Sequence, residues 1–280
     1  MKMVESQRTP WLSLVAGRTV DEQIECIRKN GNHGTSPVLR RMVLRGVGIP
    51  RPKETAENLI VFGCYLPFIT PLLLRDYLEV LDRLGMEYTY LENELCCGLP
   101  MIVTTEGAEQ EKAIEAGKEF MRMNRDLARQ KGATTIAYFC TWCAHWAKSL
   151  FPDEASRHVY YPDLIIEKLE EQTLRVAPTV VGYYEGCHLG NRYYAPGVSL
   201  DWGRYHQLLD RIEGLRVVDL PSKICCRDYP ERVVEAAEKN NLDTILCSCI
   251  SCYVVVDAVA GGRVQVKYFP EVLLQSLRGE

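Results

Sequence analysis

The chain has 280 residues, of which 47% are apolar and 25% are charged, and its formal net charge is −4. This length and apolar content suffice for two modest domains, each with its own hydrophobic core. Because basic and acidic residues are mixed along the chain, we expect no basic stripe and exclude nucleic acid as a partner. Residues 1–14 lack the apolar core of a signal peptide, and no run approaches the roughly 18 apolar residues of a spanning helix. We therefore expect no membrane span and a cytoplasmic location.

An amino-terminal extension, residues 1–57, precedes the main pattern. Residues 19–29 and 37–45 are predicted as two short helices, and the Asn-Gly-Asn-His-Gly stretch at residues 30–34 between them is typical of a turn. An extension this short cannot form a core of its own. We expect it either to cap the rest of the chain or to clamp a partner protein.

The first repeated segment covers residues 58–175. An apolar run at residues 59–62 predicts a buried strand that leads to Cys64, and an amphipathic helix ending near residue 84 leads through a short strand to Cys96-Cys97-Gly98. A long helix is predicted over residues 107–131, and its apolar spacing places five residues on the buried face: Ala113, Ala116, Phe120, Met123 and Leu127.

The first segment ends with a strand, a cysteine pair and a helix. The strand predicted at residues 136–139 leads to Cys140 and Cys143. Pro162 and Asp163 then suit the first turn of a helix, where proline and acidic residues are favoured.

The same landmarks recur in the same order in residues 176–280. An apolar run before Gly186 leads to Cys187, residues 209–212 lead to Cys225-Cys226, a strand at residues 244–246 leads to Cys249 and Cys252, and a helix starts after Pro270. An ordered recurrence of this kind indicates an internal repeat.

The alternation of strands and helices predicts an α/β fold. We expect two tandem, pseudo-symmetric cysteine-rich α/β domains with short, mostly parallel sheets, spanning residues 58–175 and 176–280, behind the helical extension of residues 1–57. In such sheets, the loops at the carboxyl ends of the strands form the site. The cysteine-bearing loops should therefore meet at one edge of each sheet.

Twelve cysteines are too many for an ordinary cytoplasmic domain, where structural disulfides are rare. Packing as a small hydrophobe explains a single cysteine, but not two Cys-Cys pairs and two CxxC pairs. Each repeat supplies five thiols, whereas a tetrahedral zinc site uses four ligands. Thiolate donors also suit iron–sulfur clusters, so each repeat is predicted to bind one metal group.

The two motifs resemble the cysteine-rich CCG domain, which occurs twice in the B subunit of heterodisulfide reductase. The resemblance covers roughly residues 58–280 and implies two non-cubane [4Fe–4S] clusters. By motif position, the first would be held by Cys64, Cys96, Cys97, Cys140 and Cys143, and the second by Cys187, Cys225, Cys226, Cys249 and Cys252.

The second motif departs from this family pattern. Arg227 replaces the glycine that follows the cysteine pair, the interval before the CxxC is short, and Cys247 is additional. Zinc is therefore kept as an alternative occupant of the second site. Cys26 and Cys247 fall outside the motif and are interpreted as core or spare thiols.

Several other side chains could assist the chemistry, and each also has a purely structural interpretation. His188, next to Cys187, is the candidate catalytic residue, as a proton donor to a departing thiolate, or else a solvated loop histidine. Trp142, His145 and Trp146 are predicted to cover the first cluster. Lys223 and Arg227 could attract an anionic thiol, or else form a solvated face.

The resemblance implies an oxidoreductase subunit that cleaves or forms a disulfide or sulfane-sulfur bond. The substrate would be a small thiol or disulfide, such as the heterodisulfide of coenzymes M and B, or protein-bound sulfur. Because the sequence has no GxGxxG signature and no ferredoxin cysteine run, flavin and electrons would come from two partner proteins of the same kind of complex, a flavin-containing A-like subunit and a ferredoxin-like C-like subunit. The alternative is an iron–sulfur electron-transfer subunit of a lactate, glycolate or glycerol-3-phosphate oxidation system.

Overall fold

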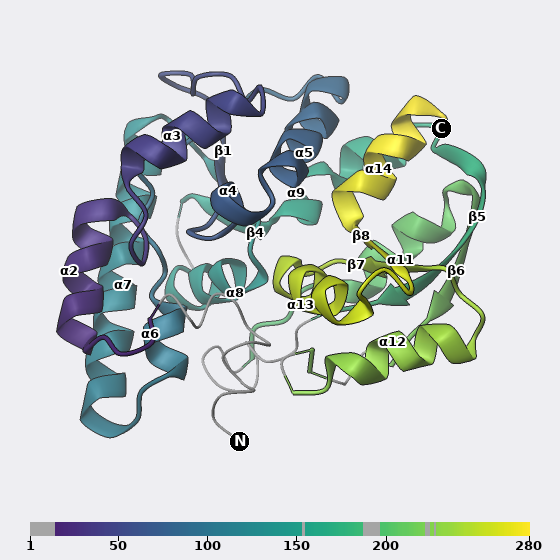
Figure 1. The fold of residues 1–280 in the computed structure, drawn as a ribbon. Helices are drawn as coiled ribbons and strands as arrows, with labels where there is room; N and C mark the ends of the chain where they lie inside the picture. The colour runs from purple at the N-terminus through teal and green to yellow at the C-terminus, as the bar shows by residue number, and fades with distance from the viewer. Residues whose placement is uncertain (1–14, 153–154, 187–196, 222–224, 227) are drawn as a thin grey trace. The chain divides into compact units, whose positions relative to one another are not determined.

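The structure is a computed structural model of the chain and describes residues 15–152, 155–186, 197–221, 225–226 and 228–280 (Figure 1). The described chain divides into two compact units. The first contains residues 15–75 and Glu87–Val159, and the second contains Asp76–Met86 and Tyr160–Glu280.

The first unit is built on a four-stranded sheet in the order β2-β1-β3-β4. Strand β1 runs parallel to both β2 and β3, with Leu59 opposite Thr89 on one side and Ile136 on the other. The elements from the amino terminus to the boundary of the unit are α2 (Val20–Asn30), α3 (Pro37–Gly46), β1 (Asn58–Val61), α4 (Leu66–Ile69), α5 (Pro71–Arg83), β2 (Tyr88–Tyr90), α6 (Leu99–Val103), α7 (Gly107–Gln130), β3 (Thr135–Tyr138), α8 (Thr141–Leu150) and β4 (Arg157–Tyr160). Helix α5 crosses into the second unit.

The amino-terminal helices belong to the first unit. Helix α2 lies along α7 (Figure 1), where Asp21 forms a 2.6 Å ion pair with Lys112 and Arg28 pairs with Glu119 at 3.1 Å. Both helices lie within a residue of their predicted ranges. On α3, Leu44 is fully buried, whereas Leu39 and Met42 are exposed.

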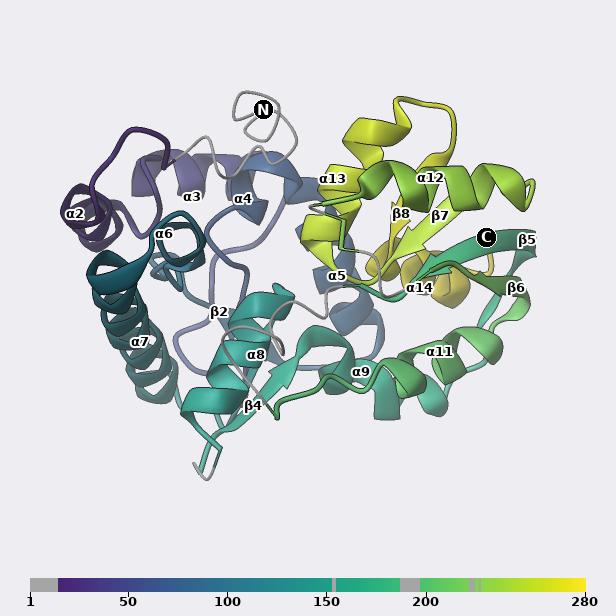
Figure 2. The same ribbon diagram turned by 90° about the horizontal axis from the view of Figure 1, so that it is seen from below.

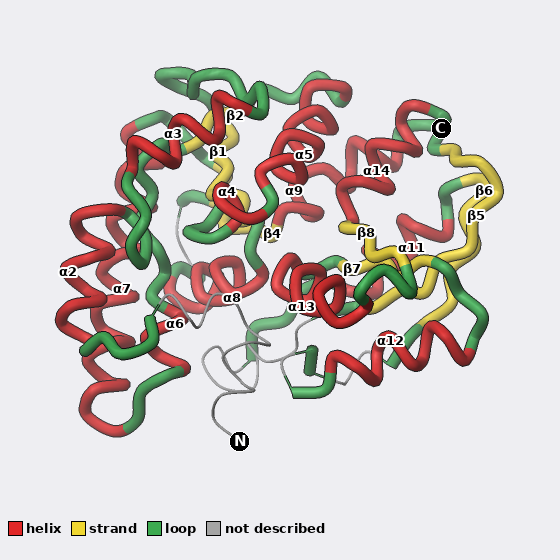
Figure 3. The backbone as a smooth tube through the Cα atoms, in the orientation of Figure 1, coloured by secondary structure: helices red, strands yellow, loops and turns green. Residues whose placement is uncertain are grey.

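The second unit repeats the architecture of the first. Its sheet has the order β6-β5-β7-β8, and β5 runs parallel to β6 and β7, as β7 does to β8 (Figure 3). Its elements are α9 (Tyr161–Glu170), β5 (Arg175–Tyr184), α11 (Trp202–Asp210), β6 (Glu213–Asp219), α12 (Pro230–Lys239), β7 (Thr244–Cys247), α13 (Ile250–Ala260), β8 (Gln265–Tyr268) and α14 (Phe269–Arg278).

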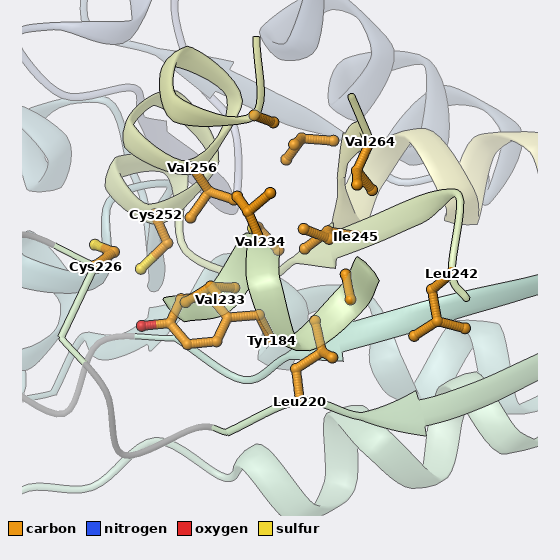
Figure 4. Packing of buried hydrophobic residues seen from close by; sticks show 14 of the residues in the cluster. Tyr184, Leu220, Cys226, Val233, Val234, Leu242, Ile245, Cys252, Val256 and Val264 are labelled. Atoms are coloured by element: carbon orange, nitrogen blue, oxygen red, sulfur yellow. The ribbon is translucent and has the colours of Figure 1, made fainter. Parts of the chain in front are cut away.

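The core of the second unit lies between its sheet and helices α12 and α13, which are side by side on one face (Figure 2). Val233 and Val234 of α12 pack with Val256 of α13 and Ile245 of β7, and the thiol of Cys252 lies in the same cluster (Figure 4). Removing this apolar surface from water provides the main stabilisation of the unit. One end of the core is therefore formed by cysteines of the second motif.

The predicted fold class is confirmed, because the chain forms two α/β units with parallel four-stranded sheets and the same strand order. The repeat extends to the helix starts. The Asp163 carboxylate accepts a hydrogen bond from the backbone N–H of Tyr160, and Glu271 does the same for Tyr268. No helix in the described part of the chain is long and apolar enough to cross a membrane.

The predicted buried face of the long helix is partly wrong. Ala113, Ala116 and Phe120 of α7 are buried as expected, but Met123 and Leu127 are exposed. The face that packs inward instead includes Gly117 and Asn124. Hydrophobic spacing missed these two residues because one has no side chain and the other is polar.

Candidate metal centre

The five cysteine thiols of the first unit come together at the carboxyl ends of three parallel strands. Cys64 follows β1, Cys96 and Cys97 follow β2, and Cys140 and Cys143 lie at the start of α8 after β3. The Cys96 thiol donates to the Cys64 sulfur at 3.1 Å, Cys97 is hydrogen-bonded to Cys96 and Cys143, and Cys143 is hydrogen-bonded to Cys140. The middle three are buried, and Cys64 and Cys140 are half-buried. The side chains thus form a continuous string of sulfur donors.

The electrostatics of this string concentrate negative charge on its middle member. Hydrogen bonds from the Cys143 and Cys96 thiols hold the pKa of Cys97 well below its usual value, against the effect of burial. The pKa of Cys96 is raised by its hydrogen bond with Cys64, and that of Cys143 by its hydrogen bond with Cys140. In the metal-free chain, Cys97 is the thiolate and its neighbours keep their protons. Binding of a metal group would therefore release protons from the flanking thiols.

Two glycines allow the Cys96-Cys97 pair to lie against helix α7. Gly98 adopts a φ of +80°, in the left-handed region that favours glycine, and its N–H donates to the Cys96 sulfur at 3.4 Å. A Cβ on Gly117 would lie 2.6 Å from the Cys97 carbonyl oxygen and 2.5 Å from the Trp146 ring. Only a residue without a side chain fits at this contact.

A buried ion pair joins the Cys64 loop to the loop that carries Cys96. Glu94 and Arg40 are 1% and 2% exposed and form a charge-assisted hydrogen bond. The second Glu94 oxygen accepts the Phe62 N–H at 2.9 Å, and Arg40 donates to the Gly63 carbonyl at 3.3 Å. Burial raises the pKa of the Glu94 carboxyl, and the Arg40 guanidinium opposes that shift. The pair fixes the backbone immediately before Cys64.

Asn124 of α7 fixes the residue that precedes the cysteine pair. Its side-chain amide donates to the Leu95 carbonyl and its oxygen accepts the Leu95 N–H, both at 2.7 Å. A two-point contact of this kind sets the path of the chain into Cys96. The polar residue on the inward face of α7 thus serves the site.

The amino-terminal extension also reaches the first site, which the sequence did not predict. The Nε2 atom of His33 lies 3.3 Å from the Cys96 sulfur, and the Cys96 N–H donates to the Gly31 carbonyl at 2.7 Å. Burial lowers the pKa of His33 to about 4, so the imidazole is neutral at neutral pH. The only sequence signal was a histidine within a turn.

Two buried polar atoms beside the first site have no hydrogen-bond partner among the described residues. They are the hydroxyl of Tyr65, which follows Cys64, and the Nδ1 atom of His33. Buried polar groups are almost always hydrogen-bonded. These two atoms are therefore consistent with a further polar group at this site.

The second unit brings together three of its predicted cysteines. Cys226, Cys249 and Cys252 are buried, and Cys252 is hydrogen-bonded to the other two, which raises its pKa. The sulfur atoms of Cys226 and Cys252 point toward one another in Figure 4. Cys225 is half-buried, and Cys247 is buried in the same core cluster, as expected for a core thiol.

Cys187, the remaining predicted ligand, lies outside the described residues, but the residue before it is placed. A Cβ on Gly186 would lie 3.2 Å from the Cys249 Cβ, and a Cβ on Gly63 would lie 3.7 Å from the Cys140 Cβ. In both units the glycine before the first cysteine lies against the first cysteine of the CxxC pair. The two units therefore share this local geometry.

Other candidate residues have mixed outcomes. His188, Lys223 and Arg227 lie outside the described residues. Cys26 is half-buried on α2, where Asn30 donates to its sulfur at 3.4 Å, so it is not a core residue. The predicted cover of the first site, Trp142, His145 and Trp146, is buried.

None of the described cysteines forms a disulfide. Among the described residues, no group of three or more His, Cys, Asp or Glu side chains has the arrangement of a site for a single metal ion. The thiols of the first unit instead form an extended string, each within hydrogen-bonding reach of the next.

Comparison with known proteins now adds to this geometry. Residues 59–147 match the family model of the cysteine-rich domain CCG. This CCG domain contains Cys64, Cys96, Cys97, Cys140 and Cys143, so the resemblance stated from the sequence is shown for the first motif.

Curated relatives extend the similarity beyond the CCG domain. The chain is 28% identical to the D subunit of dihydromethanophenazine:CoB--CoM heterodisulfide reductase of Methanosarcina acetivorans, over 67% of this chain and 49% of that protein. It is 24% identical to the C subunit of anaerobic glycerol-3-phosphate dehydrogenase of Escherichia coli, over 74% of this chain and 56% of that protein. Lactate utilization protein A of Bacillus cereus is 26% identical, over 53% of this chain and 62% of that protein.

The chain thus spans about half the length of the first two of these relatives. Among solved structures, an aspartate racemase homologue from Pyrococcus horikoshii covers 80% of this chain and 98% of its own, at a TM-score of 0.33 and 12% identity. A TM-score this low carries no argument about fold or function.

Proposed function

We propose that this chain is the iron–sulfur subunit of a heterodisulfide reductase or a related complex, which cleaves or forms a disulfide or sulfane-sulfur bond. The observation that carries the proposal is the string of five thiols at the carboxyl edge of the first sheet. Similarity to a protein named as part of a heterodisulfide reductase supports it.

The donor set of the first unit fits an iron–sulfur cluster. Such clusters are held by cysteine thiolates, whereas a structural zinc ion takes four ligands and the first site offers five sulfurs. We assign a non-cubane [4Fe–4S] cluster to Cys64, Cys96, Cys97, Cys140 and Cys143. The unpartnered Tyr65 hydroxyl supports the presence of a polar group there.

We assign a second cluster of the same type to Cys187, Cys225, Cys226, Cys249 and Cys252. Contact among Cys226, Cys249 and Cys252, and the position of Gly186 against Cys249, support this assignment. Zinc is the alternative occupant of this site. When bound, the clusters would supply electrons one at a time to thiol–disulfide chemistry, which requires two.

The chain's own side chains would protect and assist this chemistry. Trp142, His145 and Trp146 are buried on α8 beside Cys143, and would exclude water from the first site. Exclusion of solvent is one way in which a protein sets a cluster potential. We assign to His188 the donation of a proton to a departing thiolate, since imidazole titrates near neutral pH.

The proposed complex contains a flavin-containing A-like subunit and a ferredoxin-like C-like subunit, with a small thiol, a disulfide or protein-bound sulfur as substrate. The relatives named as parts of larger enzymes support membership of a complex. We propose a cytoplasmic location, supported by the absence of disulfides among so many described cysteines.

A second function is electron transfer within a lactate, glycolate or glycerol-3-phosphate oxidation system. Similarity to the C subunit of anaerobic glycerol-3-phosphate dehydrogenase and to lactate utilization protein A favours it. In that case the clusters would pass electrons but would bind no sulfur substrate. The two functions therefore differ in their response to a thiol.

The test is electron paramagnetic resonance of the oxidised, anaerobically purified chain, with and without coenzyme M as the probe thiol. Disulfide chemistry predicts that the thiol changes the spectrum of a cluster, and that a non-thiol analogue, ethanesulfonate, does not. An unchanged spectrum with intact clusters would favour the electron-transfer function. A chain with no iron–sulfur signal in any redox state would exclude both.

A further inference from the structure

His33 is positioned against the candidate centre by a rigid turn. The Asn32 side-chain oxygen accepts the N–H groups of Gly34 and Thr35, at 3.0 and 2.6 Å, and its amide donates to the Asn30 and Thr35 carbonyls. Arg18 donates to the His33 carbonyl at 2.7 Å. Every one of these contacts restrains the backbone that carries His33.

The turn is also fixed directly to the cysteine loop. Gly31 adopts a φ of +75°, and a Cβ there would lie 2.5 Å from the Glu94 carbonyl oxygen. The Gly31 carbonyl accepts the Cys96 N–H at 2.7 Å. The backbone of the turn therefore touches the same loop whose sulfur meets the imidazole.

The surroundings of the ring select one tautomer. His33 is 3% exposed, its Nε2 atom lies 3.3 Å from the Cys96 sulfur, and its Nδ1 atom has no partner among the described residues. A buried N–H without an acceptor is costly, so the proton belongs on Nε2, where a sulfur acceptor is available. Nε2 is thereby oriented to donate toward Cys96.

We infer that His33 is a positioning residue that donates a hydrogen bond from Nε2 to the Cys96 thiolate and so raises the reduction potential of the first cluster. This inference rests on the proposed function for the presence of that cluster. A hydrogen bond to a ligand sulfur stabilises the more electron-rich, reduced state. The amino-terminal turn therefore takes part in setting the redox properties of the centre.

The test compares His33→Leu, which removes the donor, with His33→Gln, whose side-chain amide can donate from a position close to Nε2. His206→Leu is the matched control, because His206 lies on α11 in the second unit, between Asp210 and Asp219. Each anaerobically purified chain is analysed for iron and for the midpoint potentials of its clusters. Chains labelled with ¹⁵N-histidine are examined by pulsed paramagnetic resonance in the reduced state.

We expect His33→Leu to keep its iron and to change the oxidised-to-reduced ratio of one cluster about tenfold toward oxidised, which is about 59 mV for one electron. His33→Gln should restore most of the shift, and His206→Leu should change nothing. A weak ¹⁵N coupling should be present in the parent chain and the control, and absent in both His33 variants.

Three results would overturn the inference. They are equal potentials in the parent chain and His33→Leu, loss of iron from both His33 variants, and a strong ¹⁵N coupling that identifies His33 as an iron ligand. If the parent chain carries no cluster, the ¹⁵N resonance of His33 in the metal-free chain decides. An Nε2 proton whose resonance shifts in Cys96→Ala supports the contact, and no shift refutes it, so failure of the proposed function is distinguishable.

Discussion

At the scale of single residues, the ten motif cysteines and Cys26 should behave differently. Cys96 and Cys97 lie in the middle of the sulfur string, whereas Cys26 bonds only to residues of its own extension, Arg18 and Asn30, in the contacts found for it. We expect Cys96→Ala or Cys97→Ala to lose the iron of the first site, about four atoms per chain for a [4Fe–4S] cluster. Cys26→Ala should retain all of it. Iron analysis of the three variants tests this, and equal loss from all three would indicate a folding defect.

The Glu94–Arg40 pair should contribute far more to stability than an ion pair on the surface nearby. Glu94→Gln leaves the buried Arg40 guanidinium without a counter-charge, which costs about 3–5 kcal/mol in the free energy of unfolding. The control is Glu92→Gln, because Glu92 and its partner Arg45 are 31% and 30% exposed, and such pairs contribute about 0–1 kcal/mol.

Urea unfolding of the anaerobic chain measures both variants. If Glu94→Gln unfolded at the same urea concentration as Glu92→Gln, the buried pair would not hold the Cys64 loop as described.

The cysteines could be predicted from the sequence, but most of the residues that position them could not. A CxxC pair is a local signal that survives without any knowledge of the fold. Glu94, Arg40 and His33 are single residues whose partners lie tens of positions away, and nothing adjacent to them marks that contact. Long-range pairing of isolated polar residues leaves no periodic pattern in one sequence.

At the scale of elements, the close approach of α7 to the cysteine pair depends on Gly117. Gly117→Ala places a Cβ against the Cys97 carbonyl and the Trp146 ring, so the helix must shift. We expect a loss of about 1–3 kcal/mol in unfolding free energy, as for an overpacked core, together with weaker retention of iron.

The matched control is Gly203→Ala on α11, where the nearest atom to an added Cβ is 3.8 Å away. An alanine in a helix is equal or better by up to about 1 kcal/mol. Thermal unfolding and iron content of the two variants decide the matter, and similar behaviour would show that α7 does not need a glycine.

The strands and helices were predictable because each repeats a strong local pattern, and the second copy repeats the first. The buried face of α7 was not, because the pattern of apolar residues cannot identify an inward Gly117 or Asn124. The boundaries at residues 58, 175 and 176 stay a prediction. The position of β4 and α9 between the two sheets explains why a boundary is hard to infer from sequence: the strand ends one unit and the helix begins the next.

At the scale of the whole molecule, the extension distinguishes a cap from a clamp. Gly31, His33 and Arg40 all contact the loops of the first site, which favours a cap. We therefore expect a chain lacking residues 1–50 to lose the iron of the first site while keeping that of the second. Iron analysis and binding to an electron-delivering partner are measured together. A clamp would instead give full iron with no complex.

The central claim is that the paired motifs hold iron–sulfur clusters, and metal analysis tests it most directly. Iron, inorganic sulfide and zinc are measured per chain after purification without oxygen. Two [4Fe–4S] clusters predict about eight iron atoms and about eight sulfides. Iron at half that level with one zinc would place zinc in the second motif. Stoichiometric zinc with little iron or sulfide would contradict the account.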